Sequence, residues 1–175
     1  MKKFLRIWLV PAVLAAAVLV SCDKLREFIE YGQYAEWATS YYFGNSLGDI
    51  STFTLDIEQG YTWDSETLNY GTEVHLVLKA PPVEGIEIPS GQYTVSDDPG
   101  QLFTVQKDRL MILDSSYIGY LDKGETEMRR YVIESGRVRI DQHEDGYTVK
   151  LRVVADGREY TLDYDGYVWA VDCVN

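Results

Sequence analysis

The chain has 175 residues, with 28 acidic against 16 basic side chains and a net charge of −12. Binding to nucleic acid depends on Lys and Arg neutralising phosphates, so this charge argues against nucleic acid as a partner. The length and the 46% hydrophobic content are enough for one domain with its own core.

The first segment has the pattern of a secretory signal peptide. Lys2, Lys3 and Arg6 precede an apolar stretch, 7–20, that contains Pro11. This stretch of about 14 residues is shorter than the roughly 20 that a membrane-spanning helix needs. A basic start, a short apolar run and a small residue before the cleavage point are typical of a removable signal, which we assign to residues 1–21.

The end of that segment, Leu19-Val20-Ser21-Cys22, resembles the lipobox of bacterial lipoproteins. The resemblance implies that Cys22 is lipidated and becomes the first residue of the mature chain. Several acyl chains would then hold the protein at a membrane without any protein segment crossing it. Ordinary secretory cleavage near Ser21 is the alternative. We expect a lipid-anchored protein of the cell envelope, at the outer membrane on its periplasmic or surface side.

The mature part is predicted to consist of a leader, 22–38, and a single β-domain, 39–175. In the leader, Leu25, Phe28 and Ile29 have helical spacing, which predicts a short amphipathic helix or tether. Removal of the signal lowers the basic residues from 16 to 13 against 28 acidic ones, so the mature net charge is −15. With Cys22 lipidated, Cys173 has no intrachain disulfide partner, and we expect it to be a small buried or terminal side chain.

The rest of the chain alternates apolar and polar residues with a period of two, which predicts half-buried strands. The alternation is clearest around 53–57, 74–78 and 147–153. Shorter segments of the same kind lie at 92–95, 102–105, 110–113, 117–121, 129–134, 137–141, 159–164 and 167–171. The predicted fold is an all-β antiparallel sandwich or barrel of about 8–10 strands.

Turn residues separate these strands. Asp156-Gly157 is the clearest hairpin turn, because Asp-Gly pairs adopt the positive φ angles that tight turns require, and the segment 129–171 is predicted to form a meander. The segment 81–89 has prolines at both ends and is expected to cross between sheets or barrel edges. Large side chains are predicted to point inward and fill the interior, among them Phe53, Leu76, Tyr93, Phe103, Ile133 and Tyr147.

Three features together look like a known group of proteins. They are the lipobox, the short acidic leader and the tyrosine-rich strands, which include Ile88-Pro89-Ser90-Gly91-Gln92-Tyr93-Thr94-Val95 and Gly146-Tyr147-Thr148-Val149. They resemble the uncharacterised lipid-anchored β-sandwich or lipocalin-like proteins of Gram-negative gut bacteria. The resemblance implies an outer-membrane accessory factor that in some cases binds glycans, and it transfers no catalytic residue.

No motif predicts a reaction. Gly44-Asn45-Ser46-Leu47-Gly48 matches a nucleophile elbow, but a strand pattern follows it where the elbow needs a helix. A calcium loop starting at Asp163 would have Val168 and Val174 where glycine and glutamate are required. A looser calcium site at adjacent acidic turns remains an alternative, as does a hydrolytic carboxylate pair. We therefore assign no catalytic residue, no metal ligand and no cofactor, and expect a protein that is not an enzyme.

The polar segment 59–71 is the predicted binding site. Tyr61, Trp63 and Tyr70 lie there in a loop or loose hairpin, and Asp64 can supply hydrogen bonds. Exposed aromatic side chains on loops are favoured at binding surfaces. We expect the β-domain to bind a glycan or another envelope component. Alternatives are a lipocalin-like carrier of an apolar small molecule and a structural or assembly lipoprotein.

Overall fold

The computed structural model describes residues 37–45, 49–59, 71–98, 100–108, 113, 115–122 and 125–174, together with the backbone of 63–64 and 67–68. These residues belong to the compact unit Gly32–Asn175. Their regular secondary structure is entirely β, which confirms the predicted fold class. The predicted signal peptide, the predicted lipidation site Cys22 and most of the predicted leader lie outside the described residues. Among the described residues, no helix is long and apolar enough to span a membrane.

The predicted strand 110–113 lies outside the described residues except for Leu113. Twelve strands are described, and most of them follow the alternating segments of the sequence. They are β1 (Trp37–Tyr42), β2 (Ser51–Gln59), β3 (Trp63–Asp64), β4 (Thr67–Leu68), β5 (Gly71–Ala80), β6 (Gly91–Ser96), β7 (Thr104–Gln106), β8 (Tyr117–Leu121), β9 (Arg129–His143), β10 (Gly146–Ala155), β11 (Arg158–Gly166) and β12 (Val168–Asp172).

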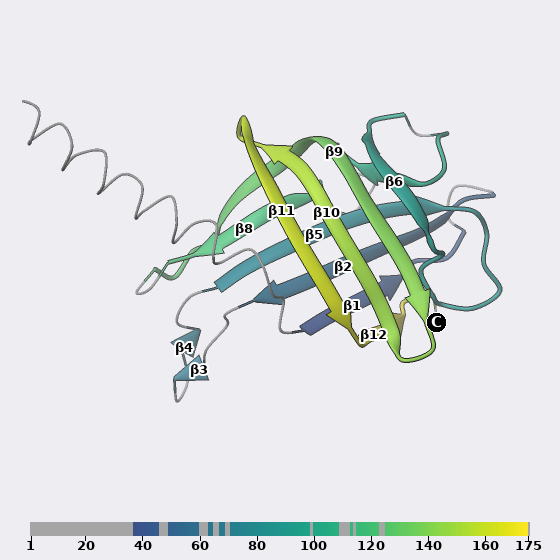
Figure 1. Ribbon diagram of the computed structural model, residues 1–175, viewed down its shortest axis with the longest axis horizontal. Coiled ribbons are helices and arrows are strands. Elements are labelled where there is room, and N and C mark those ends of the chain that lie inside the picture. Colours follow the sequence, from purple (N-terminus) through teal and green to yellow (C-terminus); the bar gives the residue numbers. More distant parts are fainter. Residues whose placement is uncertain are drawn as a thin grey trace, which may run out of the picture. The chain divides into compact units, whose positions relative to one another are not determined.

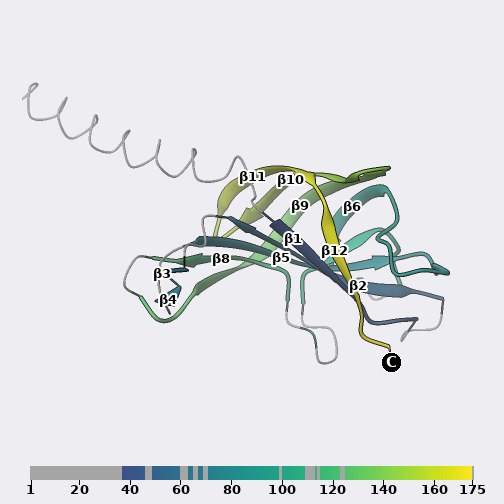
Figure 2. The same ribbon diagram turned by 90° about the horizontal axis from the view of Figure 1, so that it is seen from below.

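Ten of these strands form one sheet in the order β11-β10-β9-β6-β7-β5-β2-β1-β12, with β8 pairing both β5 and β9. The pairings β5-β7-β6-β9-β8-β5 close a five-strand ring. From this ring, β10 and β11 extend on one side, and β2, β1 and β12 on the other. The layer of β9, β10 and β11 crosses the layer of β5, β2 and β1 (Figures 1 and 2).

Ser116 closes the ring where β7 ends and β8 begins. Its backbone N–H donates to the carbonyl of Gln106 at 3.2 Å, and its carbonyl accepts from the N–H of Ile133 at 2.9 Å. Its hydroxyl accepts from the backbone N–H of Val77 at 2.9 Å. One buried serine thereby joins the ends of β7 and β8 to both β5 and β9.

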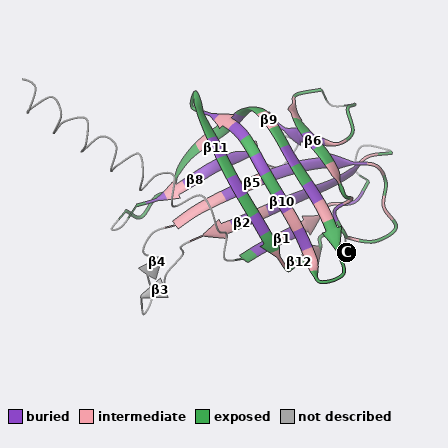
Figure 3. Cartoon of the chain, viewed as in Figure 1, coloured by how far each residue is buried: buried purple, intermediate pink, exposed green. Residues whose placement is uncertain are grey.

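The core lies between the two layers and is filled by the inward residues of every second position. Tyr93, Phe53, Leu55, Ile57 and Leu76 are among the largest side chains that are fully buried. Figure 3 shows the resulting alternation of buried and exposed positions along β9, β10 and β11. Of the predicted inward residues, Phe53, Leu76, Tyr93, Ile133 and Tyr147 are buried, and Phe103 packs half-buried against them.

The predicted meander is correct from β9 to β11 and wrong at its end. Strands β9, β10 and β11 pair in succession, and the turn at Asp156 and Gly157 has φ angles of 49° and 66°. The last strand, β12, instead pairs in parallel with β1. The two segments predicted as separate strands, 129–134 and 137–141, form the single strand β9, whose register with β10 shifts between Val154 and Ala155.

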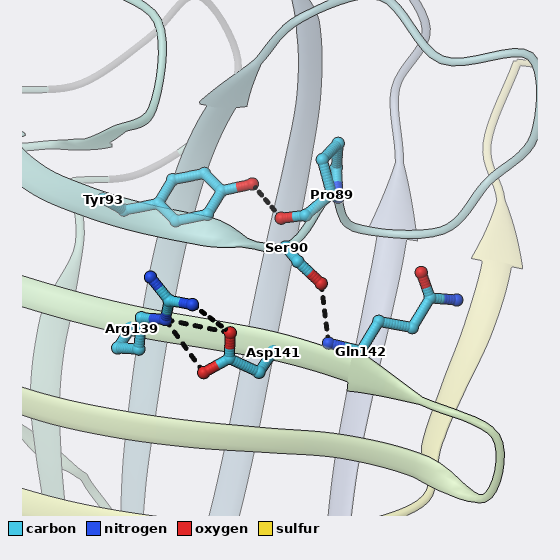
Figure 4. A network of polar contacts seen from close by, with 6 residues as sticks. All are labelled: Pro89, Ser90, Tyr93, Arg139, Asp141 and Gln142. Atoms are coloured by element: carbon cyan, nitrogen blue, oxygen red, sulfur yellow. Dashed lines mark hydrogen bonds and ion pairs between the residues drawn. The ribbon is translucent and has the colours of Figure 1, made fainter.

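The proline-containing segment 81–90 connects β5 to β6 and is tied to β9. The hydroxyl of Tyr93 donates to the carbonyl of Pro89 at 2.8 Å, and the hydroxyl of Ser90 accepts from the backbone N–H of Gln142 at 2.8 Å (Figure 4). Ile88 within this segment is buried in the core. The segment was predicted to cross between sheets or barrel edges; it instead links two strands of one sheet, β5 and β6, which β7 separates.

Candidate functional site

The outer face of the layer formed by β12, β1, β2, β5 and β8 gathers aromatic and acidic side chains. The strand register places Trp169, Thr39, Asp56, His75 and Tyr117 in one row across these five strands. A neighbouring row contains Trp37, Glu58 and Glu73. We call this surface the acid–aromatic face and define it by Trp37, Asp56, Glu58, Glu73, His75, Tyr117 and Trp169.

Two tryptophans at one side of this face are open to solvent. Trp37 on β1 is 38% exposed, and Trp169 on β12 is 65% exposed. Trp169 lies opposite Thr39, two residues from Trp37, so both indoles are on the same side of neighbouring strands. Tyr167, just before β12, is 68% exposed. Large aromatic side chains left in solvent are favoured contacts for ligands and partner proteins.

Glu58 lies beside these aromatics and carries a perturbed carboxyl group. The indole Nε1–H of Trp37 donates to Glu58 Oε2 at 2.8 Å. Partial burial raises the pKa of Glu58, the neighbouring Glu73 and Asp56 raise it further, and the Trp37 hydrogen bond opposes them. Glu58 and Glu73 stand directly opposite each other on β2 and β5. Like charges in such a cross-strand pair destabilise a sheet.

His75, which is half-buried, and Tyr117, which is buried, form the part of the face that is least open to solvent. His75 Nδ1 lies 2.5 Å from Asp56 Oδ1, and the two rings of His75 and Tyr117 stack with centroids 4.9 Å apart. The Tyr117 hydroxyl donates to Glu73 Oε1 at 2.6 Å. Burial raises the pKa of Tyr117, as does its contact with Glu73, while Arg130, whose guanidinium lies 4.6 Å from the ring centroid, lowers it. Tyr117 therefore stays a neutral hydrogen-bond donor at neutral pH.

Within the segment 59–71, where the sequence predicts the binding site, the structure describes Gln59 and Gly71 fully and 63–64 and 67–68 only in their backbone. Trp63 pairs with Leu68 and Asp64 with Thr67, so a short hairpin is present. Tyr61 and Tyr70, and the side chains of Trp63 and Asp64, lie outside the described residues. The hairpin joins the ends of β2 and β5, where Gln59 pairs with Thr72. The Gln59–Thr72 pair follows the Glu58–Glu73 pair in the ladder, so the acid–aromatic face ends next to this connection.

The rejected motifs lie elsewhere. Ser46 is outside the described residues, and the chain around it connects β1 to β2 with a hydrogen bond from the Phe43 N–H to the Thr52 carbonyl at 2.9 Å. At the acidic turns, His143 Nε2 lies 3.3 Å from Asp165 Oδ1. Asp163 faces Lys150 across β10 and β11. In the part of the chain that the structure describes, these acids do not converge on a common point.

Sequence reasoning missed the acid–aromatic face. One signal was available, because Glu73-Val74-His75 lies on a strand and residues two apart share a face. The partner Asp56 and the proximity of Trp37 to Trp169 depend on strand pairing that the sequence does not reveal. Cys173 is exposed, so the expectation of a buried side chain is wrong and that of a terminal one holds.

Comparison with known proteins gives no relative from which a function could be transferred. No protein-family model matches the chain, and neither the curated proteins nor the solved structures contain a significant match. The functional argument therefore rests on the residues of the site.

Proposed function

We propose that this chain is a lipid-anchored envelope protein whose β-domain is not an enzyme and binds a glycan on the acid–aromatic face. The signal sequence and Cys22 support anchoring at the outer membrane through acyl chains. The single observation that carries the binding proposal is the exposure of Trp37 and Trp169 on adjacent strands beside Glu58.

The chemistry of this surface suits a sugar. A sugar ring has an apolar face of C–H groups, which can stack on indole rings, and a rim of hydroxyl groups. Carboxylates accept hydrogen bonds from hydroxyls, and Glu58 and Glu73 are placed to do so. Because the mature chain carries a charge of −15, it would repel acidic polysaccharides, so we propose a neutral or amino sugar.

The carrier alternative has less support. A lipocalin-like carrier needs inward positions that leave room for its ligand. In the described part of the interior, bulky residues such as Tyr93, Phe53 and Ile133 take up these positions. A surface site agrees better with this packing than an internal one.

The test is a titration of the full-length chain in detergent with neutral and amino oligosaccharides, followed by tryptophan fluorescence. Trp37→Ala and Trp169→Ala should each weaken binding about tenfold or more, as expected for aromatic residues at the centre of a contact. Leu102→Ala, which removes a side chain with the same 38% exposure as Trp37, is the control and should have no effect.

Trp63→Ala distinguishes the two candidate sites. If it abolishes sugar binding while Trp37→Ala and Trp169→Ala do not, the hairpin is the site and the acid–aromatic face is not. If no sugar changes the fluorescence and none is retained in native mass spectrometry, glycan binding is ruled out for the compounds tested. A protein partner would then become the better hypothesis.

A further inference from the structure

Three side chains on the acid–aromatic face converge closely enough to hold a metal ion. One ring nitrogen of His75 and one carboxylate oxygen each of Asp56 and Glu73 lie within 4.8 Å of one another. Asp56 is directly opposite His75 in the β2–β5 pair, and Glu73 is two residues before His75 on the same strand. Within the described part of the chain, no other group of three His, Cys, Asp or Glu residues converges in this way.

The imidazole of His75 has the features of a metal ligand. Its side chain is only 14% exposed and that of Asp56 is 19% exposed. Nδ1 contacts Asp56, while Nε2 is shielded from solvent and has no hydrogen-bond partner among the described residues. The two ring nitrogens of an imidazole point in different directions, so an ion that His75 shares with Asp56 binds at Nδ1, the nitrogen that already lies beside that carboxylate. The proton of the neutral imidazole then resides on Nε2.

The surrounding groups support the same conclusion. Tyr117 donates its hydroxyl to Glu73 Oε1 and stacks on His75, so it orients two of the three ligands at once. Carboxylate and imidazole ligands of metals are characteristically held by such outer contacts. Glu58, directly opposite Glu73, adds a further negative charge beside the cluster. A divalent cation would relieve this repulsion.

From this geometry we propose that Asp56, Glu73 and His75 bind one divalent transition-metal ion, with zinc as the best fit. One imidazole and two carboxylates match the nitrogen and oxygen ligands that zinc accepts, and three protein ligands leave a fourth position for water or another ligand. Zinc binding can be separated from sugar binding through the exposed tryptophans, none of which is a proposed ligand, although Glu73 is placed to serve both.

Zinc binding to the full-length chain in detergent tests the proposal. Isothermal titration with ZnCl2 should give one site, and zinc should raise the melting temperature in a concentration-dependent way. His75→Ala and Glu73→Gln should each weaken zinc binding about tenfold or more. The matched control is His143→Ala, because His143 also lies beside an aspartate but has no second carboxylate converging on it. This variant should bind zinc as the unmodified chain does.

Several outcomes would overturn the proposal. The first is that the chain binds no zinc, and the second is that His75→Ala leaves zinc binding unchanged. The third is that His143→Ala weakens zinc binding as much as His75→Ala does. Asp56→Asn provides a second variant should His75→Ala fail to fold, as judged by circular dichroism. If the chain binds CaCl2 more tightly than ZnCl2 and His75→Ala does not change that binding, then the imidazole is not a ligand. Trp37→Ala and Trp169→Ala should leave zinc binding intact. Failure of the sugar proposal can therefore be distinguished from failure of the zinc proposal.

Discussion

On the outer face of β9, β10 and β11, charged side chains stand in solvent, whereas the acid–aromatic face holds its charges partly buried. The first surface, which we call the basic face, contains Arg137, Arg139, Lys150 and Arg152 on adjacent strands. Arg139 pairs with Asp141, and Arg152 lies 3.5 Å from Glu159. These pairs are between about half and two thirds exposed.

The acid–aromatic face differs mainly in burial. His75 and Asp56 are less than one fifth exposed, and Glu58 faces another carboxylate rather than a cation. The basic face also sets like charges opposite each other, Arg137 opposite Arg152 and Arg139 opposite Lys150, but these four side chains are exposed, and Arg139 and Arg152 have acidic partners. Partial burial with incomplete compensation, rather than the number of charges, therefore distinguishes the surface that we propose to be functional.

The largest expected effect is a loss of stability from the buried part of the acid–aromatic face, compared with the exposed edge of the same surface. Tyr117→Ala removes a ring that is only 6% exposed, together with its stacking on His75 and its hydrogen bond to Glu73, and should cost about 3 kcal/mol. Tyr167→Ala, which removes a 68% exposed ring, should change the free energy of unfolding by about 0.5 kcal/mol or less. Urea denaturation measures both. Equal costs would mean that Tyr117 is not an integral part of the packed structure.

The elements that the sequence predicted are those governed by local rules. The alternation of apolar residues predicted β2, β5 and β10, and Asp156-Gly157 predicted the turn between β10 and β11. Both signals depend only on residues that are neighbours along the chain. The parallel pairing of β1 with β12 joins opposite ends of the domain, and no local signal indicates it. The continuous β9 was missed because its extra residue at the register shift interrupts the alternation.

The same distinction applies to the candidate site. Glu73 and His75 share a face by simple alternation, so two of the three proposed metal ligands could be placed together from the sequence. Asp56 joins them only through the register of the β2–β5 hairpin, and a shift of one residue would point it inward. Trp37 and Trp169 lie on the same face only because β1 and β12 pair in parallel. Sites assembled across strands are thus harder to predict than the strands themselves.

A smaller effect should come from Glu58→Gln, which removes one charge from the Glu58–Glu73 pair. Burial, together with the neighbouring acids, raises the pKa of Glu58 in the folded chain above its ordinary value of 4.5. The protonated Glu58 therefore contributes favourably to the free energy of unfolding. This contribution is complete below the ordinary pKa of 4.5 and is lost as pH rises through the raised pKa of the folded chain. At pH 7 the variant should be more stable than the unmodified chain by about 0.5 kcal/mol.

This gain should disappear near pH 4, where Glu58 is protonated in both folded and unfolded chains. Urea denaturation at the two pH values measures it, and the glutamine can still accept the hydrogen bond from Trp37. Glu159→Gln on the basic face is the control, because Glu159 is 62% exposed beside Arg152 and should show no such gain. A Glu58→Gln chain that is less stable at pH 7 would mean that a cation, rather than repulsion, dominates at this carboxylate.

The smallest effect is expected on the basic face, from Arg152→Gln. This substitution removes a 67% exposed partner of Glu159 but also a like charge directly opposite Arg137. The two contributions oppose each other and are both screened by solvent, so the free energy of unfolding should change by about 0.5 kcal/mol or less. Denaturation at low and high salt measures it, since screening should shrink even this change. A loss well above 1 kcal/mol would show that charges on the basic face are not simply solvated, and exposure would then no longer separate the two faces.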